Sequence, residues 1–113
     1  MEKTIKIDGK DVRFKATAAT IRIYRQLTGR DMLVDMQELQ KHTNKTKDGL
    51  SVEALTIFED VAFVMAKQAD PTIPNTADEW LDTFEMFSIY VVLPEIVELW
   101  KLNEIGTSTA KKK

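Results

Sequence analysis

The chain has no cysteine, few glycines and prolines, and no long apolar run. Without cysteine, disulfide scaffolds, thiolate metal sites and cysteine nucleophiles are excluded. A membrane helix needs about 18 consecutive apolar residues, and no stretch approaches that length. The residues that follow Met1 also lack the apolar core of a signal peptide. We therefore expect a cytoplasmic protein without a membrane-spanning helix.

The composition is that of a folded protein. Hydrophobic residues make up 43% of the 113 residues and charged residues 30%, close to the average for globular domains. This length allows one domain with a modest core. We expect a single domain over residues 1–103, followed by a lysine-rich tail over 104–113 that is disordered because it has too little apolar content.

The net charge of −2 conceals an uneven distribution. Residues 1–50 carry eleven Lys or Arg against seven Asp or Glu, whereas residues 51–110 carry two against eleven. Such a dipole favours head-to-tail contacts between copies, and self-association is one expectation. In the alternative interpretation, the two halves neutralise each other within one fold.

The N-terminus is predicted to be a β-hairpin. Residues 3–15 alternate between apolar and polar side chains around Asp8 and Gly9. An Asp-Gly pair favours a two-residue type I′ turn, which places Ile5 opposite Val12. The apolar side chains of both strands then share one face, which helices must cover because a lone hairpin is marginal in water.

Capping residues and apolar spacing predict the helices. They are expected over residues 17–28, 31–41, 51–69, 76–87 and 88–102, with a polar loop over 42–49. Leu27, Leu33 and Phe87 are among the side chains expected to face inward. The predicted fold class is α+β, with the N-terminal hairpin packed on a bundle of four to five α-helices.

No arrangement of residues indicates catalysis, a cofactor or a metal. His42 is the only histidine and lies in the predicted polar loop without a second ligand nearby. Neither Ser51 nor Ser88 has a base at a recognisable spacing. Acidic side chains cluster over residues 78–85, where the helix dipole and solubility explain them. We expect no enzymatic activity, no small-molecule substrate and, with few aromatic residues among the basic ones, no nucleic-acid partner.

The second half of the chain is unusually rich in aromatic residues and methionine. A hydrophobic core accounts for most of them. The two helices predicted over 55–69 and 88–102 are nonetheless apolar on nearly all sides, so part of their surface is expected to form a groove for a partner. The candidate partner-binding residues are Phe58, Met65, Phe87, Tyr90, Ile96 and Trp100.

Four features, in this order along residues 4–102, carry a family resemblance. They are the hairpin sequence Ile7 to Thr17, the helix end Tyr24 to Asp31, the segment Phe58 to Pro71, and Glu79 to Asp82 leading to Leu93 to Trp100. In this order they resemble the tail assembly chaperones of phages and prophages of Gram-positive bacteria.

The resemblance implies a non-enzymatic protein of tail morphogenesis. Such chaperones coat the tape measure protein, keep it soluble until tail tube subunits polymerise around it, and are absent from the finished virion. The tape measure protein is thus the implied partner, with the tail tube protein as a further one. The family commonly makes a longer product by ribosomal frameshift. The Ala110–Lys113 end is compatible with the adenine-rich slippery site this requires, and equally with a solubilising lysine tail.

Two other classes of protein compete with this interpretation. A small DNA-binding regulator is disfavoured, because residues 32–36 are too apolar and acidic for a recognition helix. A structural subunit of the virion, such as a head–tail connector, shares the small oligomerising α+β form and remains the alternative.

Overall fold

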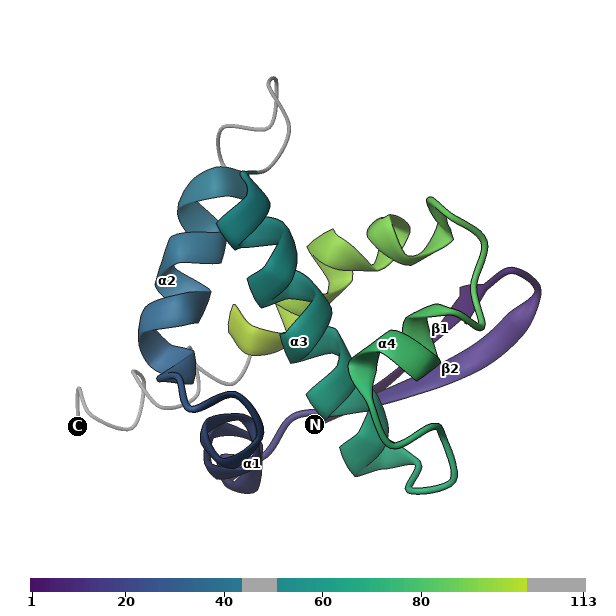
Figure 1. The fold of residues 1–113 in the computed structure, drawn as a ribbon, viewed down its shortest axis with the longest axis horizontal. Coiled ribbons are helices and arrows are strands. Elements are labelled where there is room, and N and C mark those ends of the chain that lie inside the picture. Colours follow the sequence, from purple (N-terminus) through teal and green to yellow (C-terminus); the bar gives the residue numbers. More distant parts are fainter. Residues whose placement is uncertain (44–50, 102–113) are drawn as a thin grey trace.

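The computed structural model describes residues 1–43 and 51–101, with side chains for 1–41 and 51–101. Figure 1 shows the order of elements: β1 (Glu2–Ile7), β2 (Lys10–Lys15), α1 (Ala18–Thr28), α2 (Met32–Thr43), α3 (Val52–Ala69), α4 (Ala77–Leu81) and the 3-10 helix η2 (Ser88–Val92). Residues 93–101 continue from η2 as an α-helix. The predicted α+β class, a hairpin against helices, is confirmed. The predictions for residues 44–49 and 104–113 lie outside the described residues.

The hairpin has the predicted turn and register. The strands are antiparallel, with Ile5 opposite Val12. Asp8 and Gly9 have φ angles of 54° and 76°, the two left-handed positions of a type I′ turn. The apolar face packs into the core, where Ile7 and Phe14 are buried. β2 lies against α3 and β1 against η2, so helices cover this one face of the sheet.

Local capping signals set the bounds of α1 and the start of α2. Thr17 caps α1 through its side chain, and Gly29 ends it with φ 75°, a conformation that glycine adopts without strain. The Asp31 carboxylate accepts a hydrogen bond from the Leu33 N–H at 2.9 Å where α2 begins. α2 extends to Thr43, so the backbone of His42 is helical and not part of a loop as predicted.

The inward faces of these two helices differ from the prediction. Leu27 and Leu33 are half exposed, whereas Thr20 and Met32 are buried. Thr20 can replace an apolar residue here because its hydroxyl donates a hydrogen bond to the Gln68 side chain of α3 at 2.5 Å. A buried hydroxyl with such a partner avoids the cost of desolvation.

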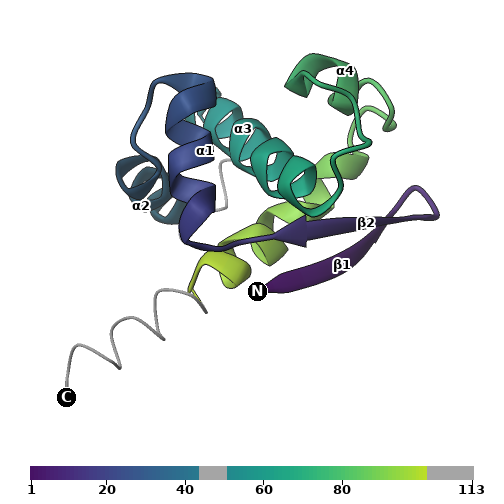
Figure 2. The same ribbon diagram turned by 90° about the horizontal axis from the view of Figure 1, so that it is seen from below.

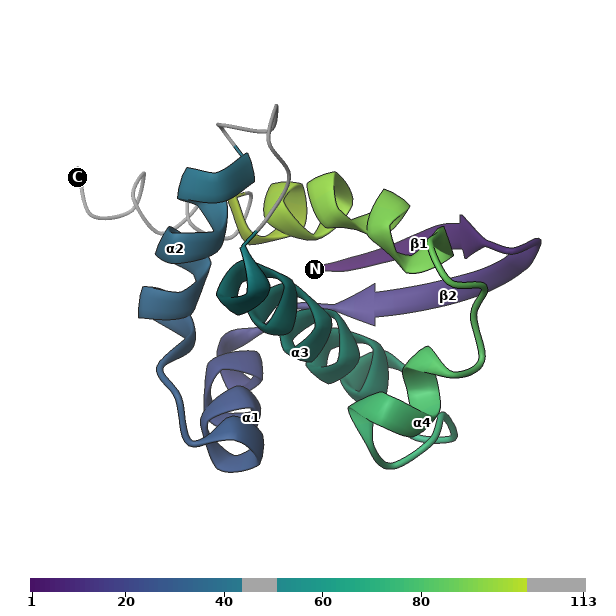
Figure 3. The same ribbon diagram turned by 45° about the horizontal axis from the view of Figure 1, so that its top comes forward.

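Helix α3 is the centre of the fold. It lies against β2, α1, α2 and α4, and Figures 2 and 3 show it crossing the molecule between the α1–α2 pair and the hairpin. A helix with neighbours on several sides must be apolar on several sides. The broad apolar surface of residues 54–66 is therefore used within the monomer.

The helix predicted over 76–87 is wrong in its second half. Thr76 caps α4 by accepting a hydrogen bond from the Glu79 N–H at 3.1 Å, but α4 ends at Leu81. The Trp80 carbonyl then accepts hydrogen bonds from both the N–H and the hydroxyl of Thr83, which closes a turn. Because the helix stops there, Phe87 leaves the inward stripe and is exposed.

Candidate functional site

The core contains four of the six side chains predicted to bind a partner. Phe58, Met65 and Ile96 are 0% exposed and Trp100 is 8% exposed. They belong to one core cluster together with the inner face of the hairpin. The side chains expected to line a client groove thus stabilise the monomer, and a partner cannot reach them in this structure. Of the six, only Phe87 and Tyr90 present surface to a partner.

A short exposed surface lies at the turn before η2 and on η2 itself. Met86, Phe87 and Val91 are 78%, 73% and 61% exposed, and we call these three residues the apolar strip. Large side chains that remain in water beside one another often mark protein interfaces. Sequence reasoning did not select Met86 or Val91 as partner-binding residues. Met86 is out of phase with the stripe formed by Trp80 and Phe84, and Val91 lies in a stretch that is apolar on nearly all sides, where spacing does not show which side chains are exposed.

The hairpin turn holds the segment that carries the apolar strip. The Asp8 carboxylate accepts hydrogen bonds from the Glu85 N–H, at 2.9 Å, and from the Ser88 hydroxyl. These bonds lower the pKa of Asp8 below its ordinary value, the Ser88 hydroxyl having the larger effect. The two residues that Asp8 binds flank Met86 and Phe87 in sequence, so these hydrogen bonds hold this part of the apolar strip in place.

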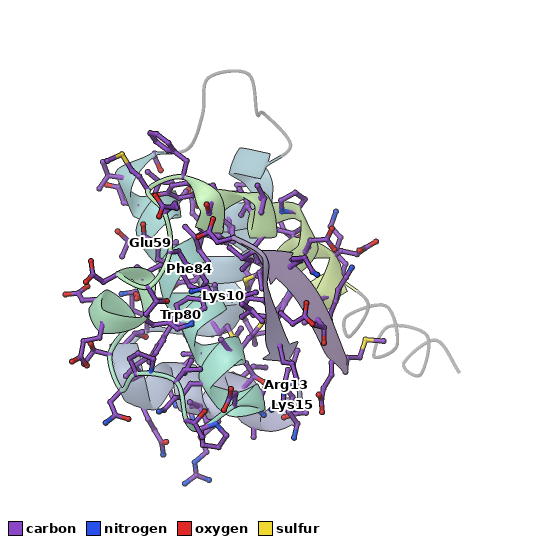
Figure 4. The ribbon with its side chains drawn as sticks, turned by 90° about the vertical axis from the view of Figure 1, so that its right-hand side faces the viewer. Lys10, Arg13, Lys15, Glu59, Trp80 and Phe84 are labelled. Carbon is purple, nitrogen blue, oxygen red and sulfur yellow. The ribbon has the colours of Figure 1, made fainter. Side chains whose placement is uncertain are left out.

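Lys10 makes a second connection to the same segment. Its ammonium group donates a hydrogen bond to the Thr83 carbonyl at 3.0 Å and lies 5.2 Å from the centre of the Phe84 ring, a cation–π distance. Figure 4 shows Lys10 beside Phe84 and Trp80, between the hairpin and the α4 segment, with Arg13 and Lys15 farther along β2.

A pocket of about 270 Å³ lies next to Lys10, between β2 and the chain that follows α3. Trp80 forms part of its wall and packs against Phe84, Phe63 and Phe14, with ring centres 5.2, 5.9 and 6.3 Å away. The charged residues around the pocket are two basic and two acidic: Lys10, Arg13, Asp11 and Asp70. This balance selects no particular charge in a ligand.

Among the described residues, no group of three or more His, Asp or Glu side chains could hold a metal ion.

Tyr90 joins η2 to α3 beside the apolar strip. Its hydroxyl donates a hydrogen bond to the Glu59 carboxylate at 3.3 Å, and its ring lies 5.9 Å from that of Phe58. Burial raises the pKa of Glu59 above its ordinary value. Burial also raises the pKa of Tyr90, and the neighbouring Glu59 charge adds to this effect. The Tyr90 hydroxyl is therefore occupied within the monomer.

A second exposed apolar surface lies where α1 meets α2. It consists of Leu27, Leu33 and Val34, each half exposed or more, and we call it the apolar corner. These residues lie at the end of α1 and the start of α2, on either side of the junction at Gly29. Sequence reasoning placed Leu27 and Leu33 inside and therefore missed this surface.

A polar network fixes the apolar corner to α3. The Arg30 guanidinium donates hydrogen bonds to Asp35, Asp60 and the Tyr24 hydroxyl at 2.9, 2.7 and 2.9 Å. Tyr24 in turn donates to Asp35 at 2.6 Å. The pKa of Arg30 is raised, first by Asp35 and then by Asp60. Burial, and next the hydrogen bond to Asp35, raises the pKa of Tyr24.

Part of the charge asymmetry is neutralised within one copy. The Lys3 ammonium contacts the carboxylates of Glu95 and Glu98, the latter at 2.9 Å. These contacts, that with Glu95 above all, raise the pKa of Lys3. The N-terminal hairpin thus binds the acidic C-terminal helix of its own chain.

Comparisons with family models, curated proteins and solved structures returned no match. No helix in the described part of the chain is long and apolar enough to cross a membrane.

Proposed function

We propose that this chain is a non-enzymatic tail assembly chaperone of a phage or prophage of Gram-positive bacteria. In this role it binds the tape measure protein in the bacterial cytoplasm and keeps it soluble during tail morphogenesis. The first support is the sequence resemblance over residues 4–102. The single structural observation that supports client binding is the exposed apolar strip of Met86, Phe87 and Val91, whose segment is tied to the hairpin turn by hydrogen bonds to Asp8.

The charge around the apolar strip indicates the chemistry of its client. Residues 77–92 contain four carboxylates and no basic side chain, and the Lys10 ammonium of β2, which binds the Thr83 carbonyl, offsets only one of these charges. An amphipathic helix whose apolar stripe is flanked by Lys or Arg therefore complements this surface. Three exposed side chains make a weak contact, but a long client that carries many such stripes gathers many copies, and the weak contacts add up.

Co-expression with the tape measure protein tests the proposal. We compare the wild-type chain, the Phe87→Asp variant and a matched control, Val52→Asp. Phe87 and Val52 are both exposed, at 73% and 76%, so neither substitution removes core contacts. Val52 is the first residue of α3, where an added carboxylate suits the helix dipole.

The wild-type chain and Val52→Asp should keep the client soluble, and Phe87→Asp should not. A client that is equally soluble with and without the chain contradicts the chaperone function. If Phe87→Asp protects the client as well as Val52→Asp does, the chain binds its client elsewhere.

The head–tail connector is distinguished by mass spectrometry of purified particles. A chaperone is absent from finished particles, whereas a connector is present in every one. Detection of this chain at a fixed stoichiometry in mature particles would replace the proposed function with the connector.

A further inference from the structure

The outer edge of β2 presents backbone groups that no described residue binds. In an antiparallel pair, every second residue of a strand directs its N–H and C=O groups at the partner strand, and the residues between direct theirs away. Met1 and Ala16 exchange two such bonds, at 2.9 and 2.8 Å, which fixes the alternation along the register. The residues of β2 whose backbone groups point away from β1 are therefore Asp11, Arg13 and Lys15. No described residue forms a hydrogen bond with these groups.

The pocket beside Lys10 lies along this edge. Its wall includes four consecutive residues of β2, from Lys10 to Arg13. Neighbouring side chains of a strand point to opposite faces, so a cavity lined by four consecutive residues follows the edge of the strand and not one of its faces. The rest of the wall includes the apolar side chains of Ile73, Pro74, Trp80 and Phe84. Figure 4 shows Trp80 and Phe84 next to Lys10, with Arg13 farther along the strand.

The charges left without an ion pair at this edge are positive. Arg13 and Lys15 make no ion pair with a described residue. The acids nearby are engaged, because Asp11 lies 3.8 Å from Lys6 and Asp70 accepts two hydrogen bonds within its own turn. A strand added to this edge would carry every second side chain beside Arg13 and Lys15, where carboxylates are favoured.

Charge also argues against occupants from this chain itself. Two β2 edges side by side would bring the cations of one copy next to those of the other, and like charges across an interface are unfavourable. Cations on an edge strand commonly prevent such pairing. Residues 102–113, with three lysines and one glutamate, have the same sign of charge as the edge. The favoured occupant is therefore an acidic strand from another protein.

We propose that β2 binds an extended, acidic segment of another protein as a third strand of the sheet. Apolar and acidic side chains alternate in this segment. The apolar ones lie against the pocket wall formed by Trp80 and Phe84, and the carboxylates lie beside Arg13 and Lys15. Backbone hydrogen bonds supply affinity and the pocket supplies specificity, as is general where a peptide extends a sheet. This chemistry is the opposite of that at the apolar strip, and the proposal does not rest on the proposed function.

Binding of labelled peptides to the purified chain, followed by fluorescence anisotropy, tests this. The probe is the capped peptide Glu-Val-Glu-Phe-Glu-Val-Glu, whose apolar side chains share one face of a strand. A second peptide has lysine in place of every glutamate. Two further peptides carry N-methyl groups, one on its glutamate amides and the other on its valine and phenylalanine amides. Only one of these two sets of amides points at β2, whichever way the added strand runs.

Two matched proline variants separate the two edges of the hairpin. Asp11 and Lys6 lie opposite each other, and both direct their N–H groups away from the hairpin, a position at which an edge strand tolerates proline. Asp11→Pro and Lys6→Pro remove the same ion pair, but only Asp11→Pro removes a donor from the edge of β2. Arg13→Glu reverses a charge at this edge and keeps the N–H. A far-ultraviolet circular dichroism spectrum of each variant verifies the fold.

The wild type and Lys6→Pro should bind the glutamate peptide, and Asp11→Pro should bind it about tenfold more weakly, although it loses an acid. One N-methylated peptide should bind as the parent does and the other should fail to bind. Arg13→Glu should prefer the lysine peptide. A wild type that does not bind the glutamate peptide, equal affinities of the two proline variants, or binding of both N-methylated peptides would each overturn the proposal. A dimer of the free chain that Asp11→Pro dissociates in sedimentation velocity would assign the edge to a second copy and would overturn it as well.

Discussion

Replacement of Arg30 by methionine gives the sharpest test of how the fold is held together. Arg30 connects α1, α2 and α3, because its guanidinium binds Tyr24, Asp35 and Asp60. Methionine keeps much of the length of the side chain but none of its donors. The substitution leaves the Asp35 and Asp60 carboxylates, 13% and 22% exposed, without a cation in a poorly hydrated place.

The burial of this network sets the size of the effect. Loss of one partner from a fully buried ion pair costs about 3–5 kcal/mol, whereas exposed pairs contribute about 0–1 kcal/mol. The Arg30 side chain is 39% exposed, so the expected loss lies between, at about 2 kcal/mol. The midpoint of urea unfolding should fall by about 1 M, and the melting temperature by about 10 °C.

Two controls accompany this measurement. Arg30→Lys keeps the charge but loses the planar fork, so it should fall between the wild type and Arg30→Met. Arg22→Met removes an exposed cation from the middle of α1 and should change the free energy of unfolding by less than about 0.5 kcal/mol. Equal effects of Arg30→Met and Arg22→Met would refute the reasoning.

Three further predictions concern the core and two carboxylates. Phe58→Ala should lower the free energy of unfolding in urea by about 3–5 kcal/mol, because Phe58 is fully buried and the substitution leaves a cavity. A loss of less than about 1 kcal/mol would contradict its place in the core. The lowered pKa of Asp8 means that its carboxylate contributes stability above its ordinary pKa of 3.8, and that this contribution is lost as the pH falls through the lower folded-state pKa. Asp8→Asn should therefore be less stable than the wild type at neutral pH and lose less stability on acidification below 3.8, as followed by urea unfolding across the acid range. The raised pKa of Glu59 has the opposite consequence, because the charged form is disfavoured in the fold. Glu59→Gln should therefore be more stable than the wild type at neutral pH, with a gain that shrinks as the pH falls below the raised pKa and is gone below the ordinary value of 4.5. An unchanged melting temperature at neutral pH would count against this.

The candidate site was only partly visible in the sequence. Phe87 and Tyr90 were identified as partner-binding residues and do reach the surface, whereas Phe58, Met65 and Ile96 are sealed inside. A helix that is apolar on several sides is expected to be buried on those sides. Its sequence does not show whether another part of the same chain or another protein buries them. For α3, four elements of the same chain supply the cover.

The sequence by itself determined the features that depend on a few neighbouring residues. The turn at Asp8 and Gly9 set the hairpin register, and the caps at Thr17 and Ser51 set where α1 and α3 begin. These signals act between backbone and side-chain groups within about four residues of each other, so the surrounding fold has little power to change them.

Only the tertiary structure decided which surfaces are exposed. Leu27 and Phe87 fit the apolar spacing of a helix yet lie in water, whereas Thr20 is buried because Gln68 binds its hydroxyl. Burial depends on contacts with segments far away in the sequence, and spacing within one helix contains no information about them. The hydrogen bonds from Glu85 and Ser88 to the Asp8 carboxylate are of this kind, because Glu85 lies 77 residues after Asp8 in the sequence, and they fix the position of the segment that carries Met86 and Phe87.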